Sequence, residues 1–249
     1  MVENGLVNSR SLAQRMVMAG QVRVDGELIL KSSYTVDSSA QIVLDEGPRF
    51  VSRGGEKLAA ALDAFDLPVT GKVCADVGAS TGGFTDCLLQ HGAGKVYAID
   101  VGKGILDWKM RRKKEVVVME KTNARYVESL PEPVQLVTID ASFISLKTLL
   151  PVVKNWFQEK GDVIALIKPQ FEAGRKEVSR GDGVIRDAEV HRSVLEQILL
   201  ASQEMGFSIK GLIRSPLVGP KGNIEFLAWL SYPGEPGNLD GMIGSVMIE

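Results

Sequence analysis

The stretch from residue 73 to residue 89 constrains the fold of this chain more than any other part. Residues 73–77 (Val-Cys-Ala-Asp-Val) are short and mostly apolar, which is typical of a buried strand, and glycine and serine residues follow at once. An apolar run that suits a helix then begins at Phe84. A strand, a glycine-rich turn and a helix N-terminus direct backbone N–H groups at whatever lies above the strand. The stretch therefore predicts a ligand-binding cradle.

The glycine spacing indicates which ligand this cradle holds. The dinucleotide fingerprint G-x-G-x-x-G needs glycine at its middle position, where the pyrophosphate approaches, but this chain has Ser80 there. Roughly twenty residues after Gly78, the apolar run 95–99 ends in Asp100, whose carboxylate can accept hydrogen bonds from ribose hydroxyls. One nucleoside without a diphosphate satisfies both observations, which favours S-adenosylmethionine over NAD. Glycine turns and strand-end acids that bind nothing are the alternative.

Further candidates for contact with this cofactor come from the same turn and from the segments that follow later strands. Asn123 follows the strand expected at 116–119, where a residue that binds the adenine ring is expected. The complete set of candidate cofactor residues is Asp76, Gly78, Ser80, Gly82, Gly83, Phe84, Asp100, Asn123, Ala124 and Asp140.

The composition limits the class of protein. A chain of 249 residues can form one sizeable α/β core plus a small module, and 45% hydrophobic with 24% charged residues is typical of globular proteins. The formal net charge is −2, so any binding of nucleic acid must come from local basic patches.

No apolar run approaches the roughly 20 residues that span a bilayer, and Met1 is not followed by a basic and then apolar leader. We therefore expect a cytoplasmic protein with no membrane partner. Cys74 and Cys87 are interpreted as small buried hydrophobes, and neither they nor His91 and His191 have partners at metal-ligand spacing, so no metal site is expected.

Residues 1–47 have a different texture from the rest of the chain. The pattern predicts a helix over 9–18 that begins at Ser9 or Ser11, a hairpin around Asp25-Gly26 and a third strand over 41–44. The motifs Ser-Arg-x-x-Ala-Gln-Arg and Gly-Gln-Val-Arg-Val-Asp-Gly resemble the S4 family of small RNA-binding modules. In that family a further amphipathic helix usually precedes this point, so we expect either a truncated N-terminus or an incomplete module. The resemblance implies RNA contacts from Arg10, Arg15, Arg23 and Lys31.

Beyond residue 54 the pattern alternates between helices and strands. Helices are expected at 55–65, 146–157 and 188–205, and strands at 116–119, 134–139, 162–167, 207–213 and 224–230. Such alternation predicts a largely parallel sheet covered on both faces. The connection between the last two strands is too short for a crossover, so these strands should pair antiparallel.

This strand order predicts where several charged side chains meet. Asp140 and Lys168 follow parallel strands, whereas Glu225 precedes a strand that runs the other way. The carboxyl ends of parallel strands and the amino end of an antiparallel strand share one edge of a sheet. We therefore expect all three residues around one crevice.

Five ordered motifs resemble the TlyA (haemolysin A) family, in which an S4 module precedes an FtsJ-like RNA ribose methyltransferase domain. They are Ser52-Arg-Gly-Gly-Glu-Lys57-Leu, Asp76-Val-Gly-Ala-Ser-Thr-Gly-Gly-Phe-Thr, Asp140-Ala-Ser-Phe-Ile, Lys168-Pro-Gln-Phe-Glu and Gly222-Asn-Ile-Glu225-Phe. The resemblance implies a Rossmann-like methyltransferase fold with seven strands, the last one antiparallel. It also implies a Lys-Asp-Lys-Glu tetrad at Lys57, Asp140, Lys168 and Glu225, and 2′-O-methylation of cytidine in ribosomal RNA or ribosomal subunits. We expect the module over 1–47, a linker over 48–54, the methyltransferase domain over 55–235 and a C-terminal tail over 236–249.

The chemistry of ribose methylation gives each tetrad residue a role. A ribose hydroxyl is a poor nucleophile, so the site must align it with the methyl donor and accept its proton. Lys168 is our candidate base: Lys57 nearby would lower its pKa, whereas Asp140 and Glu225 would raise it and would hold the two amines in place. In the alternative, Lys168 only orients the hydroxyl and water takes the proton.

Contacts with RNA outside the module are expected from basic residues near the site: Arg53, Lys109, Arg111 and Arg112. The loop over 171–183 is long and rich in glycine and charge, which predicts that it folds over the substrate. Three other functions stay open: an NAD-dependent oxidoreductase, a membrane-active haemolysin and a catalytically silent RNA-binding protein.

Overall fold

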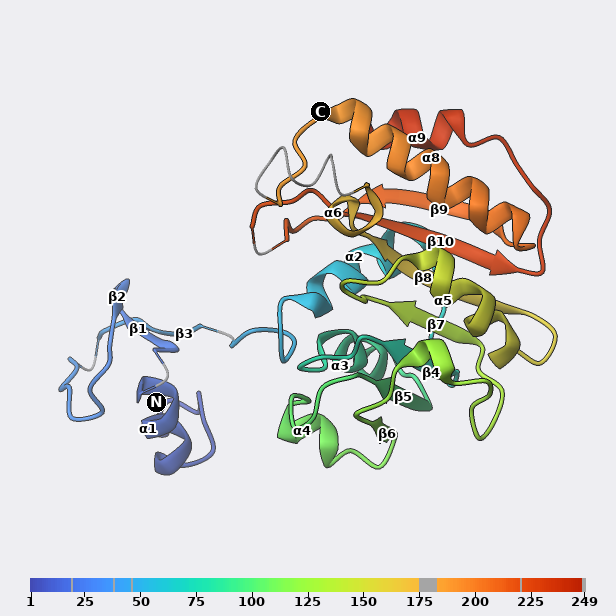
Figure 1. Cartoon of the computed structure of the whole chain (residues 1–249). Helices are drawn as coiled ribbons and strands as arrows, with labels where there is room; N and C mark the ends of the chain where they lie inside the picture. Colours follow the sequence, from blue (N-terminus) through green and yellow to red (C-terminus); the bar gives the residue numbers. More distant parts are fainter. Residues whose placement is uncertain (19, 38, 46, 175–182, 220, 248–249) are drawn as a thin grey trace. The chain divides into compact units, whose positions relative to one another are not determined.

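The computed structural model describes residues 1–249 except 19, 38, 46, 175–182, 220 and 248–249 (Figure 1). The chain forms two compact units, residues 1–49 and residues 50–249.

The first unit is a helix with a small antiparallel sheet. Helix α1 (Arg10–Met18) begins after Ser9, whose Oγ accepts a hydrogen bond from the Leu12 amide at 3.2 Å. The sheet has the order β2-β1-β3 and consists of β1 (Val22–Val24), β2 (Glu27–Leu28) and β3 (Ile42–Leu44). Asp25 and Gly26 both have positive φ, as the tight hairpin turn between β1 and β2 requires. The predicted helix and hairpin are confirmed.

The second unit is built on a seven-stranded sheet with the order β6-β5-β4-β7-β8-β10-β9. Its strands are β4 (Val73–Val77), β5 (Lys95–Ile99), β6 (Val116–Met119), β7 (Leu136–Ile139), β8 (Gly161–Ile167), β9 (Ser208–Arg214) and β10 (Phe226–Tyr232). Strands β4 to β8 run parallel, and β10 is antiparallel to both of its neighbours, β8 and β9. The expected architecture is confirmed. Because the chain order reverses between β4 and β7, the carboxyl ends of these two strands flank a topological switch point, where open α/β sheets bind ligands.

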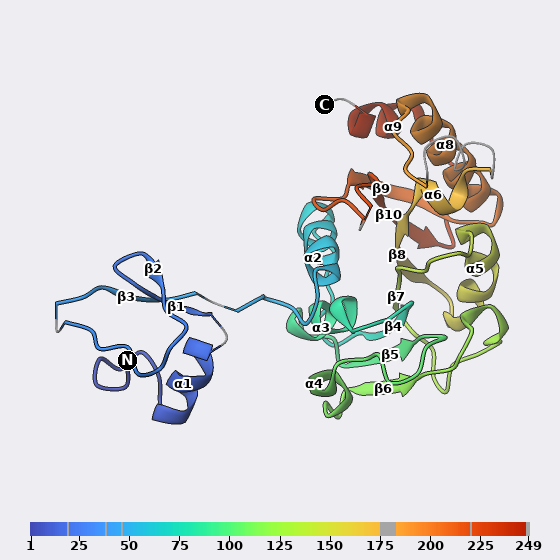
Figure 2. The same ribbon diagram turned by 60° about the vertical axis from the view of Figure 1, so that its left-hand side comes forward.

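Helices cover both faces of this sheet, as Figure 2 shows. One face carries α2 (Gly54–Phe65), α3 (Gly83–Gln90) and the short α4 (Trp108–Arg111). The other carries α5 (Leu146–Val153), α8 (Ala188–Glu204) and α9 (Asp240–Met247). The short elements η1 (Ala124–Tyr126), η2 (Lys154–Trp156) and α6 (Pro169–Glu172) lie in connections.

The two faces bury separate apolar clusters, so the sheet itself is covered on both sides. Leu58 and Leu62 of α2 pack with Leu88 of α3 in one cluster, while Leu150 of α5 and Leu199 of α8 belong to the other. Cys74 and Cys87 are fully buried, as expected, and burial raises the pKa of the Cys74 thiol to about 12.

Two expectations need correction. The expected C-terminal tail contains α9, whose Ile243 and Val246 are buried; Gly241 and Gly244 interrupt its apolar pattern and hide the helix in the sequence. The expected loop over 171–183 does not begin at Phe171, because Phe171 and Glu172 belong to α6. Residues 175–182 of that loop lie outside the described residues, so its predicted closure over substrate stays a prediction.

Candidate active site

The glycine-rich turn after β4 is shaped by contacts within the chain. Gly78 has φ +83°, and a Cβ atom there would lie 2.6 Å from the backbone oxygen of Asp140 at the end of β7. A Cβ atom on Gly83 would lie 2.3 Å from Ser52 Oγ. These glycines therefore let β4 and α3 approach neighbouring segments closely.

Asp100 fixes the other side of this turn. Its Oδ2 accepts a hydrogen bond from the Ser80 amide at 2.8 Å, and its Oδ1 accepts one from the Gly102 amide at 2.7 Å. Ser80 has φ +49°, a conformation that is uncommon for a residue with a side chain. A carboxylate has about four acceptor positions, so Asp100 can still accept hydrogen bonds from ribose hydroxyls.

Asp76 lies beneath the turn and is fully buried. Its Oδ2 accepts a hydrogen bond from Thr85 Oγ1 at 2.6 Å, and its Oδ1 accepts one from Thr138 Oγ1 at 3.1 Å. Burial raises the pKa of Asp76 to about 7, a shift that the two threonine hydrogen bonds oppose. The carboxyl group thus links β4 to α3 and β7.

Three cavities adjoin at the switch point, and Gly78, Ser80 and Asp140 line all of them. The Asp100 cavity, of about 320 Å³, is lined further by Asp100, Asn123 and Ala124 among others. The Arg53 cavity, of about 230 Å³, is lined further by Arg53, Lys57, Gly83 and Phe84 among others. The Lys168 cavity, of about 570 Å³, is lined further by Lys57, Lys168, Gln170, Phe171 and Glu225 among others.

The candidate cofactor residues fall into two groups, those that line the three cavities and those that do not. Eight of the ten line these cavities: Gly78, Ser80, Gly83, Phe84, Asp100, Asn123, Ala124 and Asp140. Asp76 and Gly82 line none of them. Asp76 supports the turn from below, and Gly82, at φ +96°, precedes α3. A role for these two in cofactor binding would be indirect.

The four candidate catalytic residues converge in the Lys168 cavity. Lys57 Nζ on α2 donates to Glu225 Oε2, just before β10, at 2.5 Å. Lys168 Nζ, just after β8, lies 2.6 Å from Asp140 Oδ1, just after β7. Lys57, Lys168 and Glu225 are all buried. Two amines and two carboxylates from distant parts of the sequence therefore form two ion pairs at one edge of the sheet.

The structure adds residues to this cavity that the sequence did not single out. Lys168 Nζ donates to Ser142 Oγ at 3.1 Å and lies 5.7 Å from the centre of the Phe171 ring. The Phe171 ring centre is 4.8 Å from that of Phe143, which has φ +63° and is 89% exposed. The sequence offers one indication of these residues, which is that they belong to the motifs that contain Asp140 and Lys168. They are Ser142, Phe143, Gln170 and Phe171.

A half-buried glutamate, Glu172, and a buried asparagine, Asn223, hold segments next to this cavity. Glu172 accepts hydrogen bonds from Ser145 Oγ at 2.6 Å and from the Leu146 amide at 2.8 Å, and so links α6 to the start of α5. Burial raises the pKa of Glu172. Asn223 accepts from the Ile185 amide at 2.9 Å and donates to the Gly183 carbonyl at 3.0 Å. Gly183 and Asn223 are thereby held together on the Lys168 cavity.

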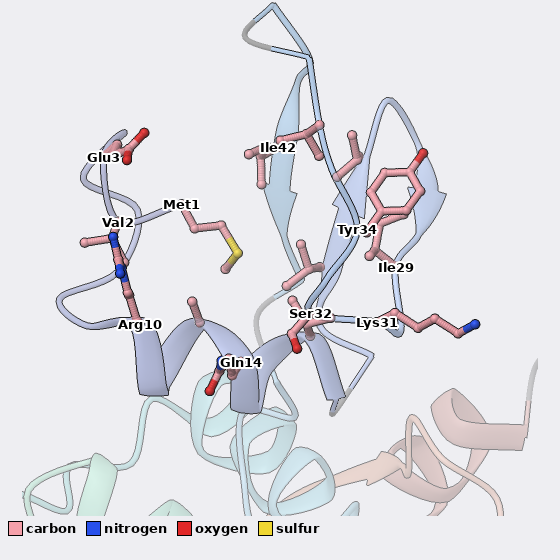
Figure 3. A pocket seen from close by; sticks show the side chains of 15 residues that line it. Met1, Val2, Glu3, Arg10, Gln14, Ile29, Lys31, Ser32, Tyr34 and Ile42 are labelled. Atoms are coloured by element: carbon pink, nitrogen blue, oxygen red, sulfur yellow. The ribbon is translucent and has the colours of Figure 1, made fainter.

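The first unit has a cavity of its own, of about 400 Å³ (Figure 3). Apolar side chains line it, including Val17, Val22 and Ile29, and Arg10 and Lys31 are also among its lining residues. Arg15 is exposed on α1. Arg23 is already engaged, because its Nε donates to Asp45 Oδ2 at 3.0 Å and its guanidinium also donates to the Gly26 carbonyl.

The basic residues of α4 and just after it also include both paired and exposed side chains. Arg111 pairs with Glu120 and donates to the Leu106 carbonyl at 2.9 Å, so it joins α4 to β6. Arg112 and Lys109 are exposed, and the Arg112 guanidinium lies 5.7 Å from the Trp108 ring centre. Arg53 is exposed at the Arg53 cavity. Of the predicted RNA contacts, Arg23 and Arg111 thus have the clearest structural roles.

Two kinds of feature are absent from the described part of the chain. Outside the few residues left undescribed, no helix is both long and apolar enough to cross a membrane. Within the same residues, no group of three or more His, Cys, Asp or Glu side chains is arranged to bind a metal ion.

Comparisons with known proteins agree with the two-unit organisation. The S4 domain model matches residues 1–42, and the FtsJ-like methyltransferase model matches residues 50–232. The 16S/23S rRNA (cytidine-2′-O)-methyltransferase TlyA of Mycobacterium tuberculosis is 43% identical over 92% of this chain and 87% of its own.

Solved structures show the same likeness. A Streptococcus thermophilus protein described as a presumed haemolysin is 42% identical, with a TM-score of 0.78, over 97% of this chain and 90% of its own. A presumed S-adenosylmethionine-dependent methyltransferase from Listeria monocytogenes, 18% identical with a TM-score of 0.51, covers 72% of this chain and 99% of its own and shares the fold.

Proposed function

We propose that this chain, which belongs to the TlyA family of FtsJ-like methyltransferases, transfers a methyl group from S-adenosylmethionine to a ribose 2′-hydroxyl of cytidine in ribosomal RNA. The observation that carries this proposal is the convergence of Lys57, Asp140, Lys168 and Glu225 in a cavity that adjoins the Asp100 cavity. Methyl transfer to a hydroxyl needs these two spaces side by side, one for the donor and one for the acceptor.

The Asp100 cavity suits the nucleoside part of the cofactor. Asp100 can accept hydrogen bonds from the ribose, and Asn123 and Ala124 stand where the adenine ring would lie. Gly78, Ser80 and Asp140, which the cavities share, would hold the methionine part. When bound, S-adenosylmethionine supplies a sulfonium methyl group that a nucleophile can displace.

The tetrad would prepare the acceptor hydroxyl. Lys168 Nζ in its neutral form would accept the proton of the hydroxyl as the hydroxyl oxygen is methylated. In the alternative, Lys168 stays charged and only orients the hydroxyl, and water takes the proton. Asp140, 2.6 Å from Lys168, would hold that amine beside the acceptor. The Lys57–Glu225 pair would complete the wall of the site and keep its charges balanced.

Binding of the RNA would come from exposed basic side chains. In the first unit these are Arg10, Arg15 and Lys31, and in the second Arg53, Lys109 and Arg112. A ribosomal substrate implies that the enzyme works in the cytoplasm, on free ribosomal RNA or on subunits.

A direct assay tests this function. The protein is incubated with tritiated S-adenosylmethionine and ribosomal RNA, and 2′-O-methylated residues are mapped by their resistance to alkaline cleavage. We expect label at cytidine, and we expect Lys168→Ala to abolish transfer while RNA binding persists. Label that maps to base atoms, or full activity of the variant, would contradict the proposal.

Two rival functions predict different results. A membrane-active haemolysin, the function that the description of the Streptococcus thermophilus protein suggests, would release dye from anionic phospholipid vesicles at low protein concentration. An oxidoreductase would bind NAD more tightly than S-adenosylmethionine in calorimetry. We expect neither result.

A further inference from the structure

Gln170, which lines the Lys168 cavity, has one buried polar atom whose hydrogen-bonding capacity is unused. Gln170, the second residue of α6, donates from Nε2 to Glu225 Oε1 at 3.2 Å. Its Oε1 is shielded from water and has no hydrogen-bond partner, which is true of no other buried side-chain oxygen or nitrogen in the described part of the chain. Native proteins satisfy nearly all such atoms, so this exception requires an explanation.

The two ends of this amide are distinguished by their surroundings. An ionised carboxylate only accepts hydrogen bonds, so the end that faces Glu225 must be the NH₂ group. Lys57 holds the other oxygen of Glu225 at 2.5 Å and so fixes the carboxylate itself. The orientation that leaves Oε1 unpartnered is therefore set by the ion pair beside it.

Stability accounts for only one end of this side chain. The hydrogen bond from Nε2 to the buried Glu225 carboxylate stabilises the folded chain, but it needs only a donor, and the unpartnered buried carbonyl at the other end is destabilising. A polar group retained at a cost to stability, in the wall of a cavity that also holds Lys168 and Glu225, is typical of a functional site.

The neighbouring side chains suit a nucleobase. Phe171 follows Gln170 directly, and its ring lies against that of Phe143, which is 89% exposed. Both rings line the Lys168 cavity, and exposed aromatic rings stack on the unpaired bases of RNA. Asp140 and Lys168 provide the polar groups for the ribose in the same cavity.

We propose that Gln170 selects cytosine by accepting a hydrogen bond at Oε1 from the N4 amino group of the target base, while Glu225 holds Nε2. Uracil carries a carbonyl oxygen where cytosine carries this amino group, so the same oxygen would repel it. Because Oε1 is buried in this structure, the terminal torsion of Gln170 must rotate to turn Oε1 into the cavity, and this torsion has a broad energy minimum. This inference depends on the proposed function, and it adds the residue that reads the base.

The test compares two synthetic RNAs that differ only in cytidine or uridine at the mapped target. Wild-type protein should favour cytidine by at least about tenfold in kcat/KM, because a site built around a hydrogen bond rejects the analogue that lacks it. Gln170→Met should lose at least about tenfold on the cytidine RNA but little on the uridine RNA, which brings the ratio close to one. Gln197→Met, at an exposed position of α8, is the matched control and should keep the wild-type ratio.

Further measurements separate recognition from folding. Gln170→Met also removes the donor to Glu225, so its melting temperature should fall modestly while the variant stays folded. It should bind S-adenosylmethionine as wild type does, since Gln170 does not line the Asp100 cavity. Gln170→Ala, a second variant, should lose the preference in the same way. An equal loss on both RNAs, or an unchanged ratio, overturns the inference even if the enzyme is active. Wild-type protein that methylates neither RNA refutes the proposed function instead.

Discussion

The buried carboxyl group of Asp76 predicts how stability depends on pH. Burial raises its pKa from an ordinary value near 3.8 to about 7, so the folded chain binds this proton more tightly than the unfolded chain does. A group whose pKa rises on folding makes its contribution to stability in the protonated form. That contribution is therefore lost as pH rises from about 4 to about 7, and it stays lost at higher pH.

The magnitude follows from the size of the shift. A rise of roughly three pKa units corresponds to about 4 kcal/mol at about 1.4 kcal/mol per unit, taken as an order of magnitude. Asp76→Asn removes the titration but keeps groups that can bond Thr85 and Thr138. Between pH 4 and pH 8, the unfolding free energy of wild type should therefore fall by about 4 kcal/mol relative to that of Asp76→Asn.

Urea denaturation of both proteins at half-unit steps of pH measures this difference directly. Thr138→Val provides a second check, because it removes a hydrogen bond that favours the charged form. In that variant the stability loss should extend to higher pH. Parallel profiles for wild type and Asp76→Asn, or a wild type that gains relative stability as pH rises, would refute the reasoning.

Three other perturbations test the contacts around the site. Gly78→Ala should lower the unfolding free energy by about 2–4 kcal/mol in urea denaturation, because φ is +83° and the new methyl would meet the Asp140 carbonyl; an unchanged midpoint would contradict this. Glu225→Ala leaves buried Lys57 without its carboxylate and should cost about 3–5 kcal/mol, whereas Lys57→Met with Glu225→Leu should recover most of that loss without recovering activity. Arg111→Ala should lower the melting temperature but leave RNA affinity unchanged, because Arg111 pairs with Glu120. Lys109→Ala with Arg112→Ala should leave the melting temperature unchanged but weaken RNA binding, and should reduce the slope of log affinity against log salt concentration by about 1–2. The opposite pattern would contradict the assignment of Arg111 to folding and of Lys109 and Arg112 to RNA.

The sequence predicted the directions of the strands and the edge of the sheet where Asp140, Lys168 and Glu225 meet. Both depend on patterns that are local: apolar runs mark strands, and the length of a connection decides between parallel and antiparallel pairing. These patterns indicate the path of the backbone through the sheet. They therefore show at which edge of the sheet a residue that follows a strand lies. Convergence of the tetrad followed from that rule together with the family motifs.

Partnerships between distant side chains were not predictable in this way. No local pattern shows that Arg23 is held by Asp45, that Arg111 is held by Glu120, or that Asp76 lies between two threonines. No local pattern shows that Gly78 must be small because the Asp140 carbonyl, about sixty residues later, lies against it. Nor does one show that the orientation of Gln170 depends on Glu225. Helix α9 was not predicted because its two glycines interrupt the apolar pattern in the sequence. Only the folded structure shows that its apolar side chains are buried.

Two synthetic RNAs that differ only at the mapped target, one with cytidine and one with 2′-deoxycytidine, decide whether the acceptor is a ribose hydroxyl held at the Lys168 cavity. Methyl transfer from S-adenosylmethionine is measured on both. We expect transfer to the first RNA and none to the second. Equal transfer to both would show that the methyl group goes elsewhere, and it would contradict the role given to the tetrad.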